Sequence, residues 1–561
     1  MWNLDLFDGM RFMRRRLTAG AVATATGLAL LAGLPSTSAS AAPTTETTEY
    51  TVVANDGVST TDAIAAITAA GGTVVSSNAA VGTFRVSSTA ADFKAKAAKS
   101  GALIGASARK PIGYAPKESP LEKPVTEGRG GKPSGGTKAD PLDDKLWGLQ
   151  MVKADKARKI EKGDRGVTVG VLDTGLDASN PDLAANFSAK LSRNFAPDIA
   201  DIDGACEVAG CVDPVGTDDG GHGTHVAGTI AAAANGTGVS GVAPNVTLVE
   251  LKGGQDSGYF FLDPVVNALT YAGDTGIDVV NMSFYIDPWL YNCKANPADA
   301  PEAQAEQRAI IAGVNRALNY AHARGVTLVA AAGNQADNLN DPQEDSTSPD
   351  YGTDPYERPI DNKTCVSLPT EGPHVIAVSS VGPSKAKAVY SNYGTEQITV
   401  AAPGGFTRDF YGTPQYNQTA NNILSSYPLK VLQESGRVDA DGNPTTSTVF
   451  KDCTAAGKCG YYTYLAGTSM ASPHAAGVAA LIVSKYGHRD RRHGGLTMSP
   501  DLVAARLVTS AQETACPTPR LRSYAQEGYG PEYDAYCSGS KSFNGFYGYG
   551  IVDAYKAVGG R

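Results

Sequence analysis

The stretch Gly467-Thr468-Ser469-Met470-Ala471-Ser472-Pro473 joins an apolar run, residues 461–465, to a long apolar pattern of helical period, residues 475–486. A turn of small residues before a helix places Ser469 at the helix N-terminus, where backbone N–H groups lack partners and the helix dipole is positive. Pro473 favours this placement, because a proline in the first turn forfeits no hydrogen bond. Ser469 is therefore a candidate nucleophile, which requires a base, an orienting carboxylate and an oxyanion donor.

Other segments contain residues of these three types. Asp173 and Asn334 each follow an apolar, strand-like run, and His222 opens a segment of helical period. Active sites of parallel sheets form at the carboxyl ends of strands. In a serine hydrolase, Asp173 would accept a hydrogen bond from the imidazole and His222 would take the proton from the Ser469 hydroxyl. Asn334 and the backbone N–H of Ser469 would stabilise the oxyanion.

Two other hydrolase mechanisms fit the sequence less well. Asp173-Thr174-Gly175 is also the aspartic-protease triplet, but its second copy, Asp274-Thr275-Gly276, follows a helical pattern and is expected to be a helix-ending turn. His222 and His225 are three residues apart with no glutamate between them, unlike the H-E-x-x-H zinc motif. We expect His225 and His474 to be structural. A lone serine or asparagine at the end of an element is usually a cap, so the joint occurrence of the four residues carries the hypothesis.

The chain from residue 145 onward alternates apolar, β-branched runs with helical patterns, which predicts an α/β fold with a mostly parallel sheet and helices on both faces. The expected strands are residues 167–172, 246–251, 277–282, 326–331 and 375–381. The expected helices are residues 222–234, 262–272, 303–323, 469–486 and 501–510. Three long irregular stretches, residues 285–301, 335–367 and 405–460, are expected to be surface loops.

Composition limits the class of protein and its compartment. The 561 residues are 42% hydrophobic and 19% charged, and the net charge of −9 argues against nucleic acid as the main partner. Eight cysteines without a C-x-x-C pair favour disulfides in an oxidising compartment over a zinc ribbon. We expect sequential pairing, although eight cysteines allow many connectivities.

The N-terminal part predicts export and a separate small unit. Arg14-Arg15-Arg16 precede an apolar run and then Ala39-Ser40-Ala41, which is the pattern of a signal peptide with its cleavage site. A membrane anchor is the less favoured alternative, because the run is short and rich in Ala and Thr. The pattern of residues 49–114 predicts a small α+β unit. Residues 116–136 are rich in Pro, Gly and charged residues, which indicates a linker.

Seven strings of the sequence resemble the subtilisin-like serine peptidases (subtilases). They are VLDTG (171–175), HGTHVAGT (222–229), GVSGVAP (238–244), VVNMS (279–283), VAAAGN (329–334), VIAVSSV (375–381) and GTSMASPHAAGVAAL (467–481). The resemblance implies a subtilase fold and endopeptidase chemistry through an acyl-enzyme, with no cofactor for catalysis. It assigns Asp173, His222 and Ser469 to the catalytic triad and Asn334 to the oxyanion hole. The order Asp, His, Ser is that of subtilisin.

The resemblance also implies how the chain is divided and what it binds. Residues 1–41 would be the signal peptide, residues 42–139 a propeptide and linker, and residues 140–561 the peptidase domain. The propeptide would be a folding chaperone and inhibitor, removed by self-cleavage near residues 138–143. Expected partners of this secreted, monomeric enzyme are protein or peptide substrates and its own propeptide, with no membrane after signal removal. The alternatives are a subtilase that transfers the acyl group to an amine, and a catalytically silent binding protein on this fold.

By the same resemblance, Ser283, Phe284, Tyr285, Ala331 and Gly333 would line the substrate cleft. Subtilases usually carry a small residue where this chain has Tyr285. Tyr285 should therefore either narrow the pocket for the side chain before the scissile bond or pack against a displaced loop.

A structural calcium site is predicted in the same way. Asp143, Asp182 and Asn235, with carbonyl groups of the loop around Asn235, would provide the oxygen ligands that a hard cation prefers. The alternative is that Asp182 is a turn residue and Asn235 a left-handed one.

Overall fold

The computed structural model describes residues 47–109, 140–349 and 355–561. The predicted signal peptide and the predicted linker lie outside these residues. Across the described ranges, no helix combines the length and the apolar character that crossing a bilayer would need.

The N-terminal part is a four-stranded antiparallel sheet with strand order β2-β3-β1-β4 and two helices. Its elements in chain order are β1 (Thr48–Ala54), α1 (Thr60–Ala69), β2 (Thr73–Asn78), β3 (Thr83–Ser88), α2 (Phe93–Lys99) and β4 (Leu103–Arg109). Ser59 caps α1 by accepting a hydrogen bond from the Asp62 N–H, as an N-cap serine does. Phe84 and Phe93 anchor a core of its own, so this part has the predicted α+β character.

A seven-stranded parallel sheet forms the centre of the larger part, with strand order β15-β14-β10-β8-β5-β7-β6. The strands are β5 (Thr168–Asp173), β6 (Arg193–Asn194), β7 (Thr247–Lys252), β8 (Val279–Met282), β10 (Thr327–Ala331), β14 (Val375–Val381) and β15 (Val400–Pro403). Five of them match the predicted strands within two residues, whereas β6 and β15 are short and were not predicted.

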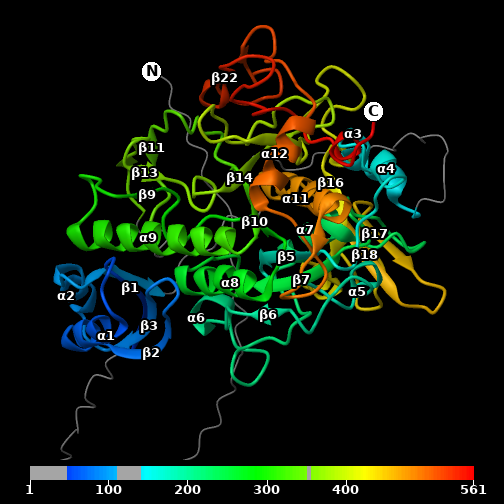
Figure 1. The fold of residues 1–561 in the computed structure, drawn as a ribbon. Helices are drawn as coiled ribbons and strands as arrows, with labels where there is room; N and C mark the ends of the chain where they lie inside the picture. Colours follow the sequence, from blue (N-terminus) through cyan, green and yellow to red (C-terminus); the bar gives the residue numbers. More distant parts are fainter. Residues whose placement is uncertain (1–46, 110–139, 350–354) are drawn as a thin grey trace, which may run out of the picture. The chain divides into compact units, whose positions relative to one another are not determined.

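Alternate residues of the strands enter two different cores, which shows that both faces of the sheet are covered. Val279 and Val329 lie in the core formed with α7 (His222–Ala231), α11 (Thr468–Tyr486) and α12 (Pro500–Ser510). Val280 and Leu328 lie in the core formed with α8 (Leu262–Thr275) and α9 (Pro301–Ala323). Figure 1 shows α8 and α9 on one side of the sheet and α7, α11 and α12 on the other. The predicted α/β architecture is confirmed.

The interpretation of residues 405–460 as a surface loop was wrong in part. They contain β16 (Ile423–Tyr427), α10 (Leu429–Glu434) and β17 (Val449–Cys453), and the two strands flank β18 (Cys459–Leu465) in an antiparallel sheet. The strands escaped prediction because polar residues interrupt them. Ser425 and Ser426 are buried against α7, where the Ser425 hydroxyl donates to the His225 carbonyl at 2.7 Å. This sheet matters for the site because β18 leads directly into the turn before α11.

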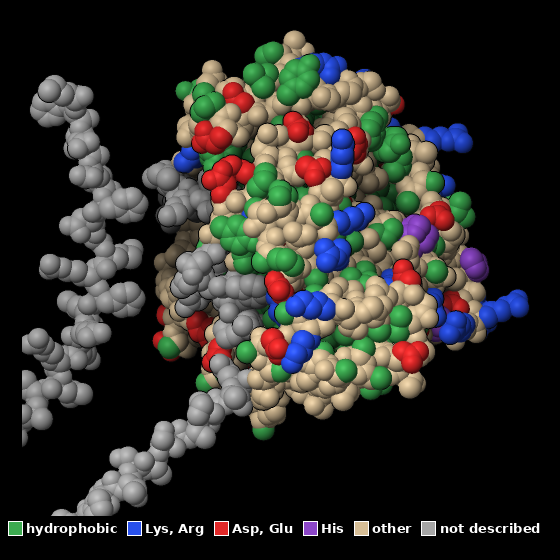
Figure 2. All heavy atoms as spheres, turned by 90° about the vertical axis from the view of Figure 1, so that its left-hand side faces the viewer, with side chains coloured by type: hydrophobic (Ala, Val, Ile, Leu, Met, Phe, Trp, Pro, Cys, Tyr) green, Lys and Arg blue, Asp and Glu red, His purple; other side chains and the backbone are tan. Residues whose placement is uncertain are grey.

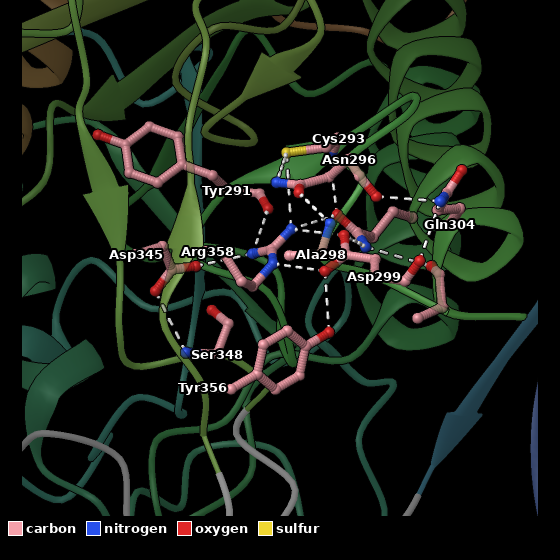
Figure 3. A network of polar contacts seen from close by, with 12 residues as sticks. Tyr291, Cys293, Asn296, Ala298, Asp299, Gln304, Asp345, Ser348, Tyr356 and Arg358 are labelled. Carbon is pink, nitrogen blue, oxygen red and sulfur yellow. Dashed lines mark hydrogen bonds and ion pairs between the residues drawn. The ribbon is translucent and has the colours of Figure 1, made fainter. Parts of the chain in front are cut away.

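Residues 285–301 and 335–367 are joined by a buried polar network (Figure 3). Their short strands β9 (Asn292–Cys293) and β13 (Cys365–Val366) pair and carry the disulfide Cys293–Cys365. Arg358 is fully buried, donates to Asp299 at 2.8 and 2.9 Å and to Asp345 at 2.9 Å, and its guanidinium lies 4.6 Å from the Trp289 ring. The remaining short strands here, β11 (Glu344–Asp345) and β12 (Arg358–Pro359), pair with each other. These two long connections are therefore joined by the disulfide and by the buried ion pair between Arg358 and Asp299.

All four disulfides join cysteines that are sequential in the chain. They are Cys206–Cys211, Cys293–Cys365, Cys453–Cys459 and Cys516–Cys537. The expectation of sequential pairing is confirmed.

Polar contacts connect the N-terminal part to α8 and α9. Glu306 in α9 accepts hydrogen bonds from the Ala108 N–H at 3.0 Å and from the Lys94 ammonium at 2.8 Å, and its side chain is fully buried. Arg316, also in α9, donates to two backbone carbonyl groups of the N-terminal part. Asn78 donates to residues of α8 at 2.9 and 2.8 Å. The outer face of this helix pair is therefore a docking surface for residues 47–109.

Candidate active site

The register of the sheet brings the predicted site residues to one edge. Leu172 in β5 and Ala330 in β10 both pair with Met282 in β8. Because the three strands are parallel and adjacent, the residues that follow, including Asp173 and Ser283, lie together at the carboxyl edge.

Asp173 and His222 meet at this edge. Asp173 is fully buried, and its Oδ1 lies 2.7 Å from Nδ1 of His222 and also accepts the Thr174 N–H at 2.9 Å. The imidazole side chain is 30% exposed, so one side of it faces outward. Gly223 permits this approach, because a Cβ there would lie 2.1 Å from the Gly175 carbonyl oxygen. An acceptor at Nδ1 places the imidazole proton there and leaves Nε2 as the basic nitrogen.

Ser469 lies in the first turn of α11, held by reciprocal bonds to Ser283. The Ser469 hydroxyl donates to the Ser283 carbonyl at 3.2 Å, and the Ser283 hydroxyl donates to the Ser469 carbonyl at 3.2 Å. The prediction that Pro473 lies in the first turn was wrong, because α11 begins at Thr468 and Pro473 lies beyond its first turn, in the helix interior. There its missing N–H deprives the Ser469 carbonyl of its helical donor, and the Ser283 hydroxyl replaces that donor.

The N-terminus of α11 offers an unpaired donor at Ser469, the candidate nucleophile. Within the described ranges, the Ser469 N–H has no acceptor, whereas the next N–H, of Met470, donates to the Gly467 carbonyl at 3.0 Å. This is the position where a developing negative charge is stabilised by the helix end.

Asn334, the second candidate oxyanion donor, contacts the same turn of α11 through Thr468. The Thr468 N–H and the Thr468 hydroxyl both lie 2.9 Å from Oδ1 of Asn334. An N–H can only donate, so the atom facing it must be the amide oxygen, and Nδ2 is left to donate elsewhere. Gly333, with φ of +102°, makes the turn, and its N–H donates to the Thr468 hydroxyl at 3.1 Å. Thr468 therefore orients Asn334, a role that was not predicted from the sequence.

We expect Asn334→Leu to lower kcat for amide hydrolysis by about 10²–10³-fold with little change in KM, a magnitude known for the corresponding side chain of subtilisin. Steady-state kinetics on a peptide substrate measures both constants. Thr468→Val, which removes the orienting hydroxyl, should show a smaller loss of kcat, and Thr468→Ser should restore it. A rise in KM with unchanged kcat in Asn334→Leu would contradict an oxyanion role.

Asp218 is a second residue of the candidate site that was not predicted from the sequence. It is buried, and its Oδ1 accepts from the Thr174 hydroxyl at 2.9 Å and from the Gly221 N–H at 2.8 Å. Its Oδ2 accepts from the N–H and hydroxyl of Thr224 at 2.8 and 2.6 Å. It thereby joins the turn after Asp173 to the start of α7. The available signal was the pair Asp218-Asp219 shortly before a helix whose N-cap is Gly221, because carboxylates commonly accept from the N–H groups of helix N-termini.

The other two histidines near the site are structural, as predicted. His225 is fully buried, its Nε2 lies 3.0 Å from the Ile423 carbonyl, and burial lowers its pKa to about 3. His474 bonds through Nδ1 to the Met470 carbonyl at 2.8 Å, and burial lowers its pKa to about 4. The second Asp-Thr-Gly triplet lies at the end of α8, with Gly276 in the left-handed conformation, so the turn interpretation is confirmed.

The five predicted cleft residues fall into different environments. The Ser283 hydroxyl is internal, 2.8 Å from the Ser472 hydroxyl, and Phe284 stacks on Phe260 with ring centroids 4.0 Å apart. Tyr285 packs against the buried cluster that includes Tyr291. The carbonyl of Ala331 accepts from the Thr370 hydroxyl at 2.5 Å, and a Cβ on Gly333 would lie 2.4 Å from Asn392 Nδ2. A role in substrate binding stays a prediction for all five.

The three predicted cation ligands each contact or belong to the loop of residues 235–240. Among the described residues, however, their carboxylates belong to no group of three whose ligand atoms all lie within 4.8 Å of one another. Both oxygens of Asp143 accept from Ser240, and Asp182 accepts from the Val239 N–H at 2.9 Å and from the Asn235 amide at 3.2 Å. Asp140, not predicted, joins them, and its buried Oδ2 lacks a hydrogen-bond partner within the described ranges. The donor set suits a hard cation, and the partnerless oxygen fits a site for one.

Two other carboxylate clusters do bring oxygens within 4.8 Å of one another. They are Asp198–Glu207–Asp213 and Glu207–Asp219–Asp256. Acidic clusters of a kind that calcium occupies are therefore present elsewhere in the chain.

Comparison with known proteins identifies the family. Residues 164–550, more than half of the chain, match the model of the Subtilase family. The chain belongs to this family of serine endopeptidases. Subtilisin DY from Bacillus licheniformis is 30% identical to this subtilase over 340 residues, which is 61% of the chain and 85% of the relative. Thermitase from Thermoactinomyces vulgaris is 28% identical over 351 residues, which is 62% of the chain and 86% of the relative.

Solved structures show the same fold. The Epidermin Leader Peptide Processing Serine Protease (EpiP) from Staphylococcus aureus has a TM-score of 0.58 at 21% identity, covering 91% of this chain and 98% of that one. Fervidolysin from Fervidobacterium pennivorans has a TM-score of 0.53 at 21% identity, covering 92% of this chain and 61% of that one. Both likenesses extend over most of this subtilase and concern its fold.

Proposed function

We propose that this subtilase is a secreted serine endopeptidase that hydrolyses peptide bonds through an acyl-enzyme and removes its own propeptide. The observation that carries the proposal is the 2.7 Å contact between Asp173 and Nδ1 of His222, at the sheet edge where Ser469 lies in the first turn of α11. In the proposed reaction, His222 Nε2 takes the proton from the Ser469 hydroxyl as the oxygen attacks the carbonyl carbon. His222 then donates that proton to the leaving amine.

The donors beside Ser469 have their roles in the same step. Nδ2 of Asn334 and the N–H of Ser469 donate to the carbonyl oxygen as it becomes an oxyanion. Both donors are fixed before the substrate binds, one by Thr468 and the other by the helix, so little reorganisation is required. Calcium would be held by Asp140, Asp143, Asp182 and Asn235, where it would link the start of the peptidase domain to residues 235–240. It would supply stability and no catalytic step.

The N-terminal part is proposed to be the inhibitory propeptide. The support for this is the docking surface on α8 and α9, where Glu306 accepts one hydrogen bond from a backbone N–H and one from a lysine of residues 47–109. Secretion is supported by the four disulfides, because disulfides persist in oxidising compartments. The proposal also includes a signal peptide that ends at residue 41, a propeptide and linker that end at residue 139, and a monomeric mature enzyme.

Proteins and peptides are the proposed partners. The proposal leaves out nucleic acid on the basis of the net charge of −9. Figure 2 shows cationic and anionic side chains interspersed on one face of the molecule.

The test is to treat the secreted protein with a serine-reactive fluorophosphonate and to map both the label and the new N-terminus by mass spectrometry. Label on Ser469, with a chain that begins near residue 140, is the expected result. Protein that stays unlabelled and full length would favour a catalytically silent binding protein. Labelled protein that joins an added amine to the acyl group faster than it hydrolyses the substrate would favour a transpeptidase.

A further inference from the structure

Two histidines and an aspartate lie together at the amino edge of the sheet, opposite the carboxyl edge that holds the candidate active site. His322 lies in the last turn of α9, His374 directly precedes β14, and Asp501 lies in the first turn of α12. Residues 322 and 374 precede β10 and β14, so they lie near the amino ends of these parallel neighbours. Ser469 and its partners are at the carboxyl edge, so this cluster is separate from the catalytic machinery.

The three side chains are in direct contact. The imidazole rings of His322 and His374 stack with centroids 3.7 Å apart and planes 7° from parallel. Nε2 of His322 lies 3.0 Å from Oδ1 of Asp501. One nitrogen of each ring and one carboxylate oxygen all lie within 4.8 Å of one another. Three potential ligand atoms from three separate elements therefore lie close together. Because the two ring planes are nearly parallel, one imidazole must turn before both nitrogens can bind a single ion.

The conformation of His374 is unusual and places its ring in the cluster. Its φ of +64° is in the left-handed region, which a non-glycine residue adopts at an energetic cost. Nε2 of this ring lies 3.1 Å from Oδ1 of Asn319, which is on the same face of α9 as His322, three residues earlier. An amide that holds the second imidazole is the kind of outer contact that fixes the orientation of metal-bound histidines.

We propose that His322, His374 and Asp501 form a binding site for a divalent transition metal, with zinc as the reference ion. Two imidazoles and one carboxylate are a donor set that zinc accepts, with a fourth position left for water. Zinc ligands bound at 2.0–2.2 Å in a tetrahedron lie about 3.3 Å apart, so the atoms must approach by ~1.5 Å at most. The exposure of His374 and Asp501 at the surface leaves both side chains room for this movement.

Metal binding at this cluster would join the C-terminal end of α9 to α12 and to the start of β14. A ligand that binds only the folded state stabilises it by mass action. The expected consequences are a higher unfolding temperature and slower proteolysis, with no part in the peptide-bond chemistry.

The test uses the full-length Ser469→Ala protein without a histidine tag, which avoids autolysis, in buffer with excess calcium so that oxygen-ligand sites are filled. Titration calorimetry with zinc alone is expected to show saturable binding of about one ion per chain. Zinc is also expected to raise the unfolding temperature by about 2–5 °C. His374→Asn is the main variant, because asparagine tolerates the left-handed conformation and so keeps the backbone.

The variants separate a metal site from a surface effect. His374→Asn and His322→Ala should each weaken zinc binding at least tenfold and remove the thermal shift, and Asn319→Ala should weaken binding about 10–100-fold. His493→Gln is the matched control, because His493 pairs with Asp490 at 2.9 Å in a histidine–aspartate contact outside this cluster. It should bind zinc as the parent does. Absence of saturable binding in the parent, or equal affinity in His374→Asn, would overturn the proposal.

Discussion

Replacing Ser469 with alanine is expected to lower the rate of peptide-bond hydrolysis by about 10⁶-fold, a magnitude measured for the nucleophile of subtilisin. The reason is that, in the proposed mechanism, this hydroxyl is the group that attacks the substrate carbonyl, and the Ser469 N–H beside it has no acceptor within the described ranges. The helix itself should be unaffected, because alanine is a good helix former and the hydroxyl has one resolved bond, to the Ser283 carbonyl at 3.2 Å.

The measurement is kcat/KM on a chromogenic peptide amide, with purity established by fluorophosphonate labelling so that traces of wild type are detected. Ser484→Ala is the matched control, since it removes a serine hydroxyl from the same helix, where that hydroxyl bonds to the Ala480 carbonyl at 2.8 Å. It should retain full activity. A Ser469→Ala protein that kept more than about 1% of the activity would exclude an acyl-enzyme on this residue.

The sheet could be predicted because its strands are buried on both faces and are therefore continuously apolar. Residues 327–331 are an example, since tertiary structure and local pattern agree in them. In contrast, β16 contains Ser425 and Ser426, which are buried with polar partners from α7. Only Ile423 and Leu424 precede this serine pair, whereas four apolar residues precede Ser379 and Ser380 in β14. The apolar run of β16 was therefore too short to indicate a strand, and residues 405–460 were predicted as a loop.

The candidate site could be predicted from its reacting groups but not from the groups that hold them. Asp173, His222 and Ser469 stand in strings whose small residues allow close approach of the backbone. Asp218 and Thr468 have the sequence signature of helix caps, and only the structure shows that their oxygens bond to the segments that carry the reacting groups.

The position of Pro473 also needed the structure. The helix tolerates this proline because the Ser283 hydroxyl, which follows the distant strand β8, donates to the carbonyl that the proline leaves without a donor. The cluster of His322, His374 and Asp501 is a similar case. Its members share no spacing and come together only through the packing of α9, β14 and α12.

Asp173→Asn is expected to lower kcat by about 10⁴-fold while the protein stays folded, the magnitude known for this substitution in a serine-protease triad. Asparagine has the shape of aspartate, but its amide can donate to Nδ1 of His222. The imidazole proton would then move to Nε2, which could no longer accept the proton of the Ser469 hydroxyl. The carboxylate is fully buried, so solvent does not supply a substitute acceptor.

Kinetics on a peptide amide, together with the rate of fluorophosphonate labelling, measures this effect, and both rates should fall together. Asp278→Asn is the matched control, because Asp278 is a buried carboxylate at the amino end of β8 that accepts from the Thr168 N–H at 2.8 Å. An asparagine oxygen keeps that bond, so the control should retain its activity. Equal loss in the two variants would indicate that buried carboxylates act here through stability alone. Loss confined to Asp173→Asn, with an unchanged unfolding temperature, would assign the orientation of the imidazole to this one side chain.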